Sequence, residues 1–184
     1  MKIPKSAQKV FEGVLFNVYH WQQKMFDGTT QTFEMISRKP SVDVIATVGN
    51  NILLLQQEQP TKPLFPSLPG GMLEEEESHK IAAKRELLEE TGYSSSKLKL
   101  LFEWEGKSKE FFHECTFVAR ECKKVQEQHL DGGEKIRVTL VSFDDFLQSC
   151  RNPLFTAPLG LKFIMYEALL DEKKKEELRK MIYG

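Results

Sequence analysis

The sequence predicts an α/β fold, and three observations lead to that prediction. Short apolar runs with the two-residue alternation of β-strands recur along the chain, one segment carries helix start and stop signals, and apolar residues near the C-terminus recur at helical spacing. A length of 184 residues suffices for one hydrophobic core. We therefore expect one main domain, residues 41–184, preceded by a small antiparallel β-sheet in residues 1–40.

The N-terminal extension has the pattern of a β-hairpin or small sheet. Val14, Phe16 and Val18 lie at alternate positions, as in a strand with one apolar face. The dipeptide Asp27-Gly28 is a turn signal, and apolar residues resume beyond it. These features predict two antiparallel strands that are joined by a tight turn.

Two apolar runs, residues 42–47 and 51–56, begin the main domain and are expected to be central strands. The intervening Gly49-Asn50 supports a tight turn between them. Residues 57–71 contain four prolines, which lack a backbone donor and oppose both helix and regular sheet. We expect this stretch to be a stiff loop.

A helix of average length is predicted after that loop, because Ser78 is a suitable N-cap and Gly92 a suitable C-terminal stop. Apolar residues at helical spacing between about positions 159 and 182 indicate one or two amphipathic helices at the C-terminus. Three strand-like runs lie between these helical segments: residues 98–104, 111–119 and 136–143.

Composition excludes several classes of protein. Lys and Arg number 26 against 27 Asp and Glu, and no long basic tract is present, which disfavours binding to a nucleic-acid polymer. Cys115, Cys122 and Cys150 are odd in number and lack metal-ligand spacing, which suits a reducing compartment. No apolar run resembles a signal peptide or approaches the roughly 18 residues of a membrane span. We expect a cytoplasmic protein without a membrane partner.

The predicted helix has one acidic and one apolar face. At about 100° per residue, Glu86, Glu89 and Glu90 fall on one side, where their like charges repel. A solvated face balanced by nearby Lys and Arg is one explanation; the other is a metal site, because carboxylate oxygens are preferred ligands of Mg²⁺. Four apolar residues of the helix are expected in the core: Ile81, Ala83, Leu87 and Leu88.

The full segment favours the metal site. It reads Gly71, five residues, Glu77, seven residues, then RELLEETGY over residues 85–93, and Leu-Pro-Gly precedes it at 68–70. This string resembles the Nudix box at every defining position. The resemblance implies a Nudix-type α/β/α sandwich with a mixed central β-sheet, and a pyrophosphohydrolase that cuts the diphosphate linkage of a nucleoside diphosphate attached to another moiety.

The resemblance also implies roles for individual residues. Arg85 and Glu77 would orient the metal-binding groups, because a guanidinium can bind carboxylate oxygens through two parallel hydrogen bonds. The cofactor would be Mg²⁺, with Mn²⁺ as an alternative. The metal ligands would be the carboxylates and one backbone carbonyl of this set: Gly71, Glu86, Glu89 and Glu90.

A general base is expected either in the box or in a loop after it. The turn Asp131-Gly132-Gly133-Glu134 lies in the appropriate region, so Glu134 is our candidate from the loop. Glu89 is the alternative from the box. With Arg85, these residues form the expected catalytic set.

The flanking sequence bears on the substrate. Residues 11–38 resemble the N-terminal sheet of the ADP-ribose and nucleotide-sugar pyrophosphatase branch. The resemblance implies a homodimer and an aromatic residue stacked on the base, for which Trp21 is the first candidate and Phe33 the second. Two departures weaken the ADP-ribose assignment: residues 56–60 read QQEQP without the arginine of that branch, and residues 104–109 lack its proline.

Three functions therefore remain open. The leading one is hydrolysis of a nucleotide sugar such as ADP-ribose, and the two departures leave a different nucleotide sugar or a broad specificity equally open. The second is a house-cleaning pyrophosphohydrolase that acts on nucleoside triphosphates. The third is a nucleotide-sensing domain without catalysis, which is disfavoured because such domains often lose box glutamates and this chain retains all of them.

Overall fold

The computed structural model describes residues 2–106 and 109–184, so Lys107 and Ser108 of the proline-free segment lie outside the described residues. The chain divides into two compact units. We call Met1–Pro40 together with Trp104–Glu114 the N-terminal unit, and Ser41–Glu103 together with Cys115–Gly184 the main unit.

The N-terminal unit is built on a four-stranded sheet. Its β2–β3 hairpin turns at Gly28, where φ is +86°, and the Asp27 carboxylate accepts a hydrogen bond from the backbone N–H of Thr29 at 2.9 Å. Glycine adopts this left-handed conformation without steric cost. The strands lie in the order β1 (Gln8–Glu12), β2 (Phe16–Lys24), β3 (Thr30–Arg38) and β10 (Glu110–Phe111), with β10 parallel to β3.

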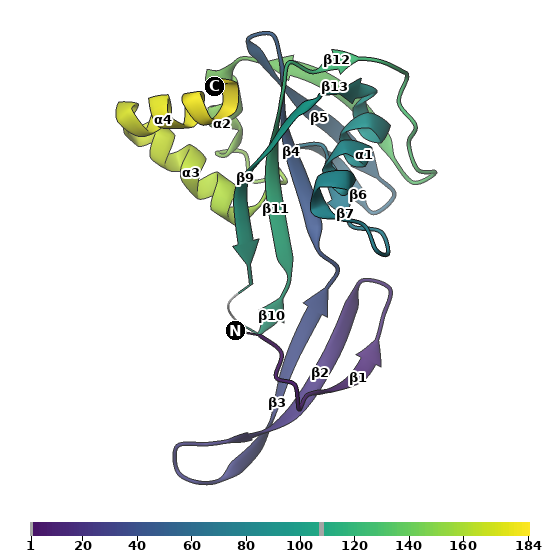
Figure 1. Ribbon diagram of the computed structural model, residues 1–184, viewed down its shortest axis with the longest axis vertical. Helices are drawn as coiled ribbons and strands as arrows, with labels where there is room; N and C mark the ends of the chain where they lie inside the picture. The colour runs from purple at the N-terminus through teal and green to yellow at the C-terminus, as the bar shows by residue number, and fades with distance from the viewer. Residues whose placement is uncertain (1, 107–108) are drawn as a thin grey trace. The chain divides into compact units, whose positions relative to one another are not determined.

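A seven-stranded sheet forms the centre of the main unit (Figure 1). Five strands follow one another in the order β13 (Lys135–Val141), β5 (Asn51–Gln59), β4 (Ser41–Val48), β11 (His113–Arg120) and β9 (Lys97–Glu105). Two further strands extend it, β6 (Lys62–Ser67) beside β5 and β7 (Gly70–Met72) beside β4. A separate pair consists of β8 (Tyr93–Ser94) and β12 (Lys123–Lys124).

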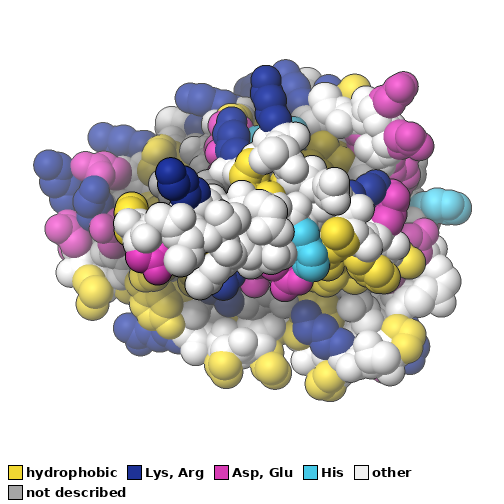
Figure 2. Space-filling view, turned by 90° about the horizontal axis from the view of Figure 1, so that it is seen from below, with side chains coloured by type: hydrophobic (Ala, Val, Ile, Leu, Met, Phe, Trp, Pro, Cys, Tyr) yellow, Lys and Arg dark blue, Asp and Glu magenta, His cyan; other side chains and the backbone are white. Residues whose placement is uncertain are grey.

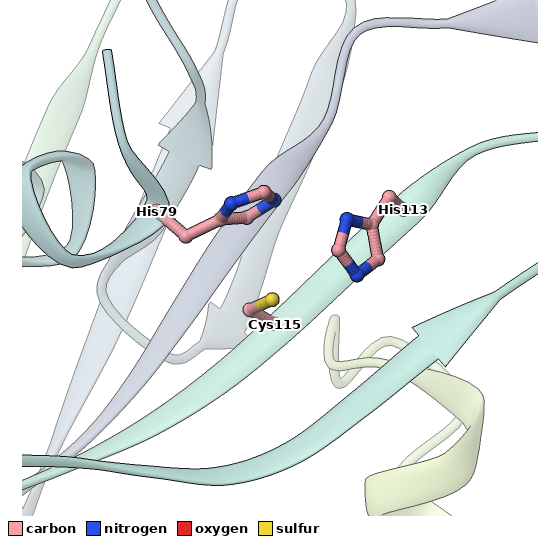
Figure 3. Close-up of side chains that lie close together, drawn as sticks. All are labelled: His79, His113 and Cys115. Atoms are coloured by element: carbon pink, nitrogen blue, oxygen red, sulfur yellow. The ribbon is translucent and has the colours of Figure 1, made fainter.

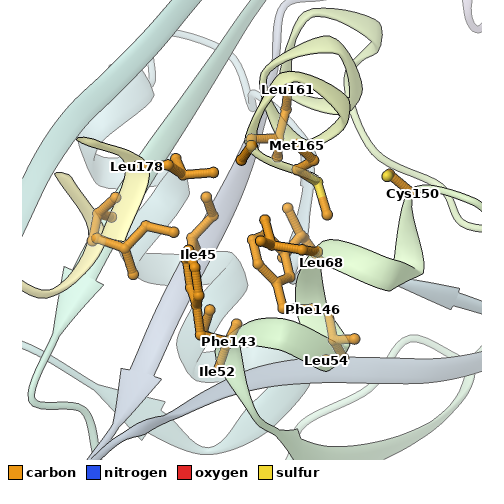
Figure 4. Close-up of a cluster of buried hydrophobic side chains, with 14 of the residues drawn as sticks. Ile45, Ile52, Leu54, Leu68, Phe143, Phe146, Cys150, Leu161, Met165 and Leu178 are labelled. Atoms are coloured by element: carbon orange, nitrogen blue, oxygen red, sulfur yellow. The ribbon is translucent and has the colours of Figure 1, made fainter. Parts of the chain in front are cut away.

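Helices cover both faces of this sheet (Figure 1). Helix α1 (His79–Thr91) packs on one face through Ala82, Ala83 and Leu87. The opposite face is covered by α2 (Phe143–Ser149), α3 (Leu159–Leu170) and α4 (Glu172–Tyr183), which enclose the buried cluster in Figure 4. The α/β prediction is confirmed, and β4 and β5 are central strands as expected.

Two local predictions were wrong. Residues 57–71 are not a loop, because β5 continues to Gln59 and β6 and β7 follow within the stretch. Pro63 and Pro66 lie in β6, where a missing donor is tolerated in a strand that pairs with β5 on one side. Ile81 is 59% exposed instead of buried, since it lies on the solvent side of α1.

Charged side chains of both signs are interspersed with hydrophobic ones on the face in Figure 2. No helix among the described residues combines the length and apolar character needed to cross a bilayer. All three cysteines are described and buried, and no disulfide joins them.

Candidate active site

Helix α1 is positioned by its two caps. At its start, the Ser78 hydroxyl accepts a hydrogen bond from the backbone N–H of Ile81 at 3.4 Å. At its end, Gly92 has a φ of +73° and donates to the Leu88 carbonyl at 2.8 Å. A Cβ at Gly92 would also collide with the Gln126 carbonyl. Glycine is therefore required there both by backbone conformation and by space.

Strand β7 brings two glycines against the acidic face of α1. The backbone N–H of Gly70 donates to Glu90 Oε2 at 2.7 Å. A Cβ at Gly71 would collide with the Glu86 carboxylate, so that only glycine allows this approach. The structure thus brings Gly71 together with Glu86, two of the residues that the sequence assigned to metal binding.

Arg85 connects the carboxylates of the box. Its Nε and one terminal nitrogen donate to the two oxygens of Glu77 at 3.0 and 2.9 Å. The other terminal nitrogen donates to Glu86 at 2.9 Å and to Glu89 at 3.1 Å. Arg85 also reaches the Met72 carbonyl at 3.2 Å. This side chain therefore holds three glutamates in place relative to one another.

These contacts have electrostatic consequences. The hydrogen bonds from Arg85 lower the pKa of Glu77, and the same pairing raises the pKa of Arg85 above its ordinary value. Burial raises the pKa of Glu86, although Arg85 opposes the shift. Glu90 is only 5% exposed, and burial raises its pKa to about 9. The last two carboxylates are therefore held in surroundings that disfavour their negative charge.

Glu134 faces the same group of carboxylates. It lies in the turn that precedes β13, and its backbone N–H donates to the Asp131 carbonyl at 3.0 Å. Burial raises the pKa of Glu134, and the Glu89 charge contributes to the shift. The charge of Glu134 in turn raises the pKa of both Glu86 and Glu90.

The loop before this turn is tied to the end of α1. The Gln128 side-chain amide donates to the carbonyl of Glu90 at 2.5 Å and to that of Ile136 at 3.2 Å. The backbone N–H of His129 donates to the Glu89 carbonyl at 2.8 Å. Gln128 was missed in the sequence, because its role depends on two segments that meet only in the folded chain.

Asp43 was also missed. It lies on β4 directly opposite Gly70 of β7, and its charge contributes to the raised pKa of Glu90. A signal was present in the sequence, since Asp43 is the only charged residue in the apolar run at 42–47. A carboxylate in a central strand loses hydration, and hydrogen bonds or opposite charges must offset that cost. Such a residue often belongs to a functional site.

The donor set of this site suits a divalent cation. Glu86, Glu89 and Glu90 could supply hard oxygen ligands, which Mg²⁺ and related ions prefer. Arg85 donates hydrogen bonds to Glu77, Glu86 and Glu89. Burial raises the pKa of the fourth glutamate, Glu90, to about 9. A bound cation would stabilise the ionised carboxylates that burial disfavours.

Trp21 and Phe33 are neighbours in the N-terminal unit. They face each other across β2 and β3, with ring centroids 5.8 Å apart in an edge-to-face arrangement. Trp21 is 6% exposed, and its ring N–H donates to the Gln23 side chain at 3.1 Å. Phe33 is half-buried and offers more surface to a ligand.

A histidine and a cysteine approach each other elsewhere in the main unit. His79 is the first residue of α1, Cys115 lies on β11, and their potential ligand atoms are within 4.8 Å (Figure 3). His113, two residues before Cys115, belongs to the N-terminal unit. Burial raises the pKa of the Cys115 thiol to about 11, which keeps the metal-free thiol protonated at neutral pH.

The family follows from a match over more than half of the chain. The NUDIX domain model matches residues 37–159, which include α1 and the carboxylates described above. The chain belongs to the Nudix family. It is thus a Nudix hydrolase, and Arg85, Glu86, Glu89 and Glu90 lie on its box helix.

Two curated relatives cover most of this Nudix chain. An ADP-ribose pyrophosphatase of Bacillus subtilis (strain 168) is 29% identical over 149 residues, which are 78% of this chain and 80% of the relative. A methanol dehydrogenase activator of Bacillus methanolicus is 27% identical over 148 residues, 77% of this chain and 79% of the relative.

A solved structure shares the fold. The crystal structure of an ADP compounds hydrolase matches with a TM-score of 0.71 at 18% identity, and the match covers 92% of this chain and 95% of that chain. At this identity, the likeness supports the Nudix fold alone.

Proposed function

We propose that this Nudix hydrolase cuts the diphosphate linkage of a nucleotide sugar such as ADP-ribose, with Mg²⁺ as its cofactor. The observation that carries the proposal is the convergence of Glu86, Glu89, Glu90 and Glu134 beside Arg85. The name of the Bacillus subtilis relative, an ADP-ribose pyrophosphatase, supports a substrate that contains ADP.

The box residues would hold the cation. Glu86, Glu89 and Glu90 supply carboxylate oxygens, and the backbone at Gly71 is close enough to Glu86 to add a carbonyl. A divalent cation at such a site makes bound water more acidic and neutralises charge on phosphate oxygens. Arg85 would keep Glu86 and Glu89 oriented through its hydrogen bonds, without contacting substrate.

Glu134 is the favoured general base. Burial raises its pKa, and a carboxylate becomes a stronger base as its pKa approaches the working pH. Glu89 accepts a hydrogen bond from Arg85 at 3.1 Å, which occupies one of its oxygens and suits a metal ligand better. Glu134 would accept the proton of the attacking water, and Glu89 remains the alternative base.

The N-terminal unit would contribute dimerisation and base recognition. Large apolar residues are exposed on it, including Phe11, Val14 and Phe26, and a second copy could cover them. We propose that it joins two copies in a homodimer. Phe33, with Trp21 packed against it, is the candidate for stacking on the base.

One assay tests the activity and its substrate. The purified protein is incubated with ADP-ribose, other nucleotide sugars, dinucleotides and nucleoside triphosphates, each with Mg²⁺, Mn²⁺ or excess EDTA, and products are separated by chromatography. We expect two phosphorylated products from ADP-ribose, and no reaction in EDTA. Pyrophosphate release from triphosphates alone would support the house-cleaning alternative instead.

A matched pair of variants completes the test. Glu75→Gln changes an exposed glutamate before α1, whereas Glu89→Gln makes the same chemical change within the box. We expect Glu75→Gln to retain activity and Glu89→Gln to lose most of it. Nucleotide binding by the unmodified protein without turnover of any substrate would indicate the sensing alternative.

A further inference from the structure

Helix α3 is apolar on two opposite faces. Leu161, Met165 and Ala168 lie on one face and are buried in the core. Four large residues on the other face are exposed: Leu159 by 61%, Phe163 by 63%, Tyr166 by 42% and Leu170 by 84%. A helix that is apolar all round is usually covered on every side. The exposed face therefore has the character of an interface.

The four exposed residues form a continuous line, which we call the α3 seam. At about 100° per residue they fall within an arc of about 60° along the helix. They are separated by four, three and four residues, the spacing of the a and d positions in a coiled coil. Leu159 and Tyr166 take the d positions, and Phe163 and Leu170 take the a positions.

Two opposite charges border the α3 seam. Lys162 and Glu167 lie about 70° to either side of its centre, at the g and e positions respectively. They are the only charged residues of α3. Their sign and placement determine which kind of helix can pack there.

We propose that the α3 seam packs against the α3 seam of a second copy of this chain, in parallel about a two-fold axis. In parallel helices a g position faces the e position five residues further along the other helix, so Lys162 meets the partner's Glu167. The two-fold axis creates this pair twice. In an antiparallel pair, Lys162 would instead face the Lys162 of the second copy and Glu167 its Glu167, and these like charges would repel.

The size of the surface predicts a weak association. Four side chains with these exposures present roughly 500 Å² of apolar surface, so two copies would cover roughly 1,000 Å². Stable interfaces usually bury about 1,200–2,000 Å². Association through the α3 seam should therefore depend on protein concentration. It would be an additional step, separate from dimerisation through the N-terminal unit.

Cross-linking tests the orientation. A parallel two-fold pair places Phe163 beside the partner's Phe163, so Phe163→Cys should form a disulfide-linked dimer under mild oxidation. The natural cysteines are buried and do not compete. Lys173→Cys, on exposed α4, is the control and should remain monomeric on a denaturing gel. Equal cross-linking of both variants, or of neither, would overturn the proposal.

Charge reversal tests the identity of the partner. Lys162→Glu and Glu167→Lys each create like-charge pairs and should weaken association by roughly tenfold in sedimentation velocity. An equal mixture of the two variants restores opposite charges in the mixed pair, so its association should return to that of the unmodified protein. A mixture that associates no better than either variant refutes the pairing, provided that both variants retain the circular dichroism of the unmodified protein.

Discussion

Replacing Glu90 by glutamine removes a buried ionisable carboxyl group while preserving the shape of the side chain. The amide oxygen of glutamine can still accept the hydrogen bond that Gly70 donates to Glu90 at 2.7 Å. The variant therefore separates the effect of charge from that of packing. In the presence of a cation the lost charge is a lost ligand, and we expect turnover to fall at least about 100-fold.

The raised pKa of Glu90 sets the size of the effect of this carboxyl group on the stability of the metal-free protein. Burial raises the pKa of Glu90 from 4.5 to about 9, and Glu86, Glu134 and Asp43 contribute to the shift. At about 1.4 kcal/mol per pKa unit, the shift corresponds to roughly 6 kcal/mol. Folding thus favours the protonated form. The stability that the protonated Glu90 carboxyl contributes is fully present below about pH 4.5 and is lost as the pH rises through about 9.

The assay is urea denaturation in EDTA at a series of pH values between 5 and 9. The free energy of unfolding of the unmodified protein should fall relative to that of Glu90→Gln by up to about 1.4 kcal/mol per pH unit. Glu75→Gln should follow the unmodified protein. Saturating Mg²⁺ should reduce the slope, since the cation stabilises the ionised form. Parallel pH profiles for the unmodified protein and Glu90→Gln would contradict a raised pKa of Glu90 in the folded protein.

Three other substitutions test separate parts of the site. Arg85→Lys loses the paired hydrogen bonds to Glu77, and we expect kcat/KM or metal affinity to fall about 10- to 100-fold, measured by steady-state kinetics and metal titration. Glu134→Gln should lower kcat about 100- to 10,000-fold and remove the acidic limb of the pH–rate profile while metal affinity changes little; an unchanged profile would favour Glu89 as the base. Gly92→Ala should destabilise the protein by more than about 1 kcal/mol in urea denaturation, because alanine is strained at a φ of +73° and its Cβ would collide with the Gln126 carbonyl. Unchanged stability would contradict the requirement for glycine at this position.

Features that depend on neighbouring residues could be predicted from the sequence. Ser78 and Gly92 bound α1 because capping involves groups within a few residues. The turns at Gly28 and Gly49 have positive φ for the same local reason. The spacing of the box likewise identified the helix face that carries Glu86, Glu89 and Glu90 and indicated a Nudix chain.

Features that depend on distant segments were decided by the tertiary structure. The proline-rich stretch is part of the sheet because β5 provides a partner for β6, which no local pattern records. Asp43 and Gln128 could not be assigned to the site from the sequence. They belong to it because β4 pairs with β7 and the loop after β12 is hydrogen-bonded to α1. The reaction class and the residues of the box could be predicted from the sequence, since both are encoded within 23 consecutive positions. The electrostatic surroundings of those residues were set by tertiary structure, because burial and long-range charge depend on which segments meet in space.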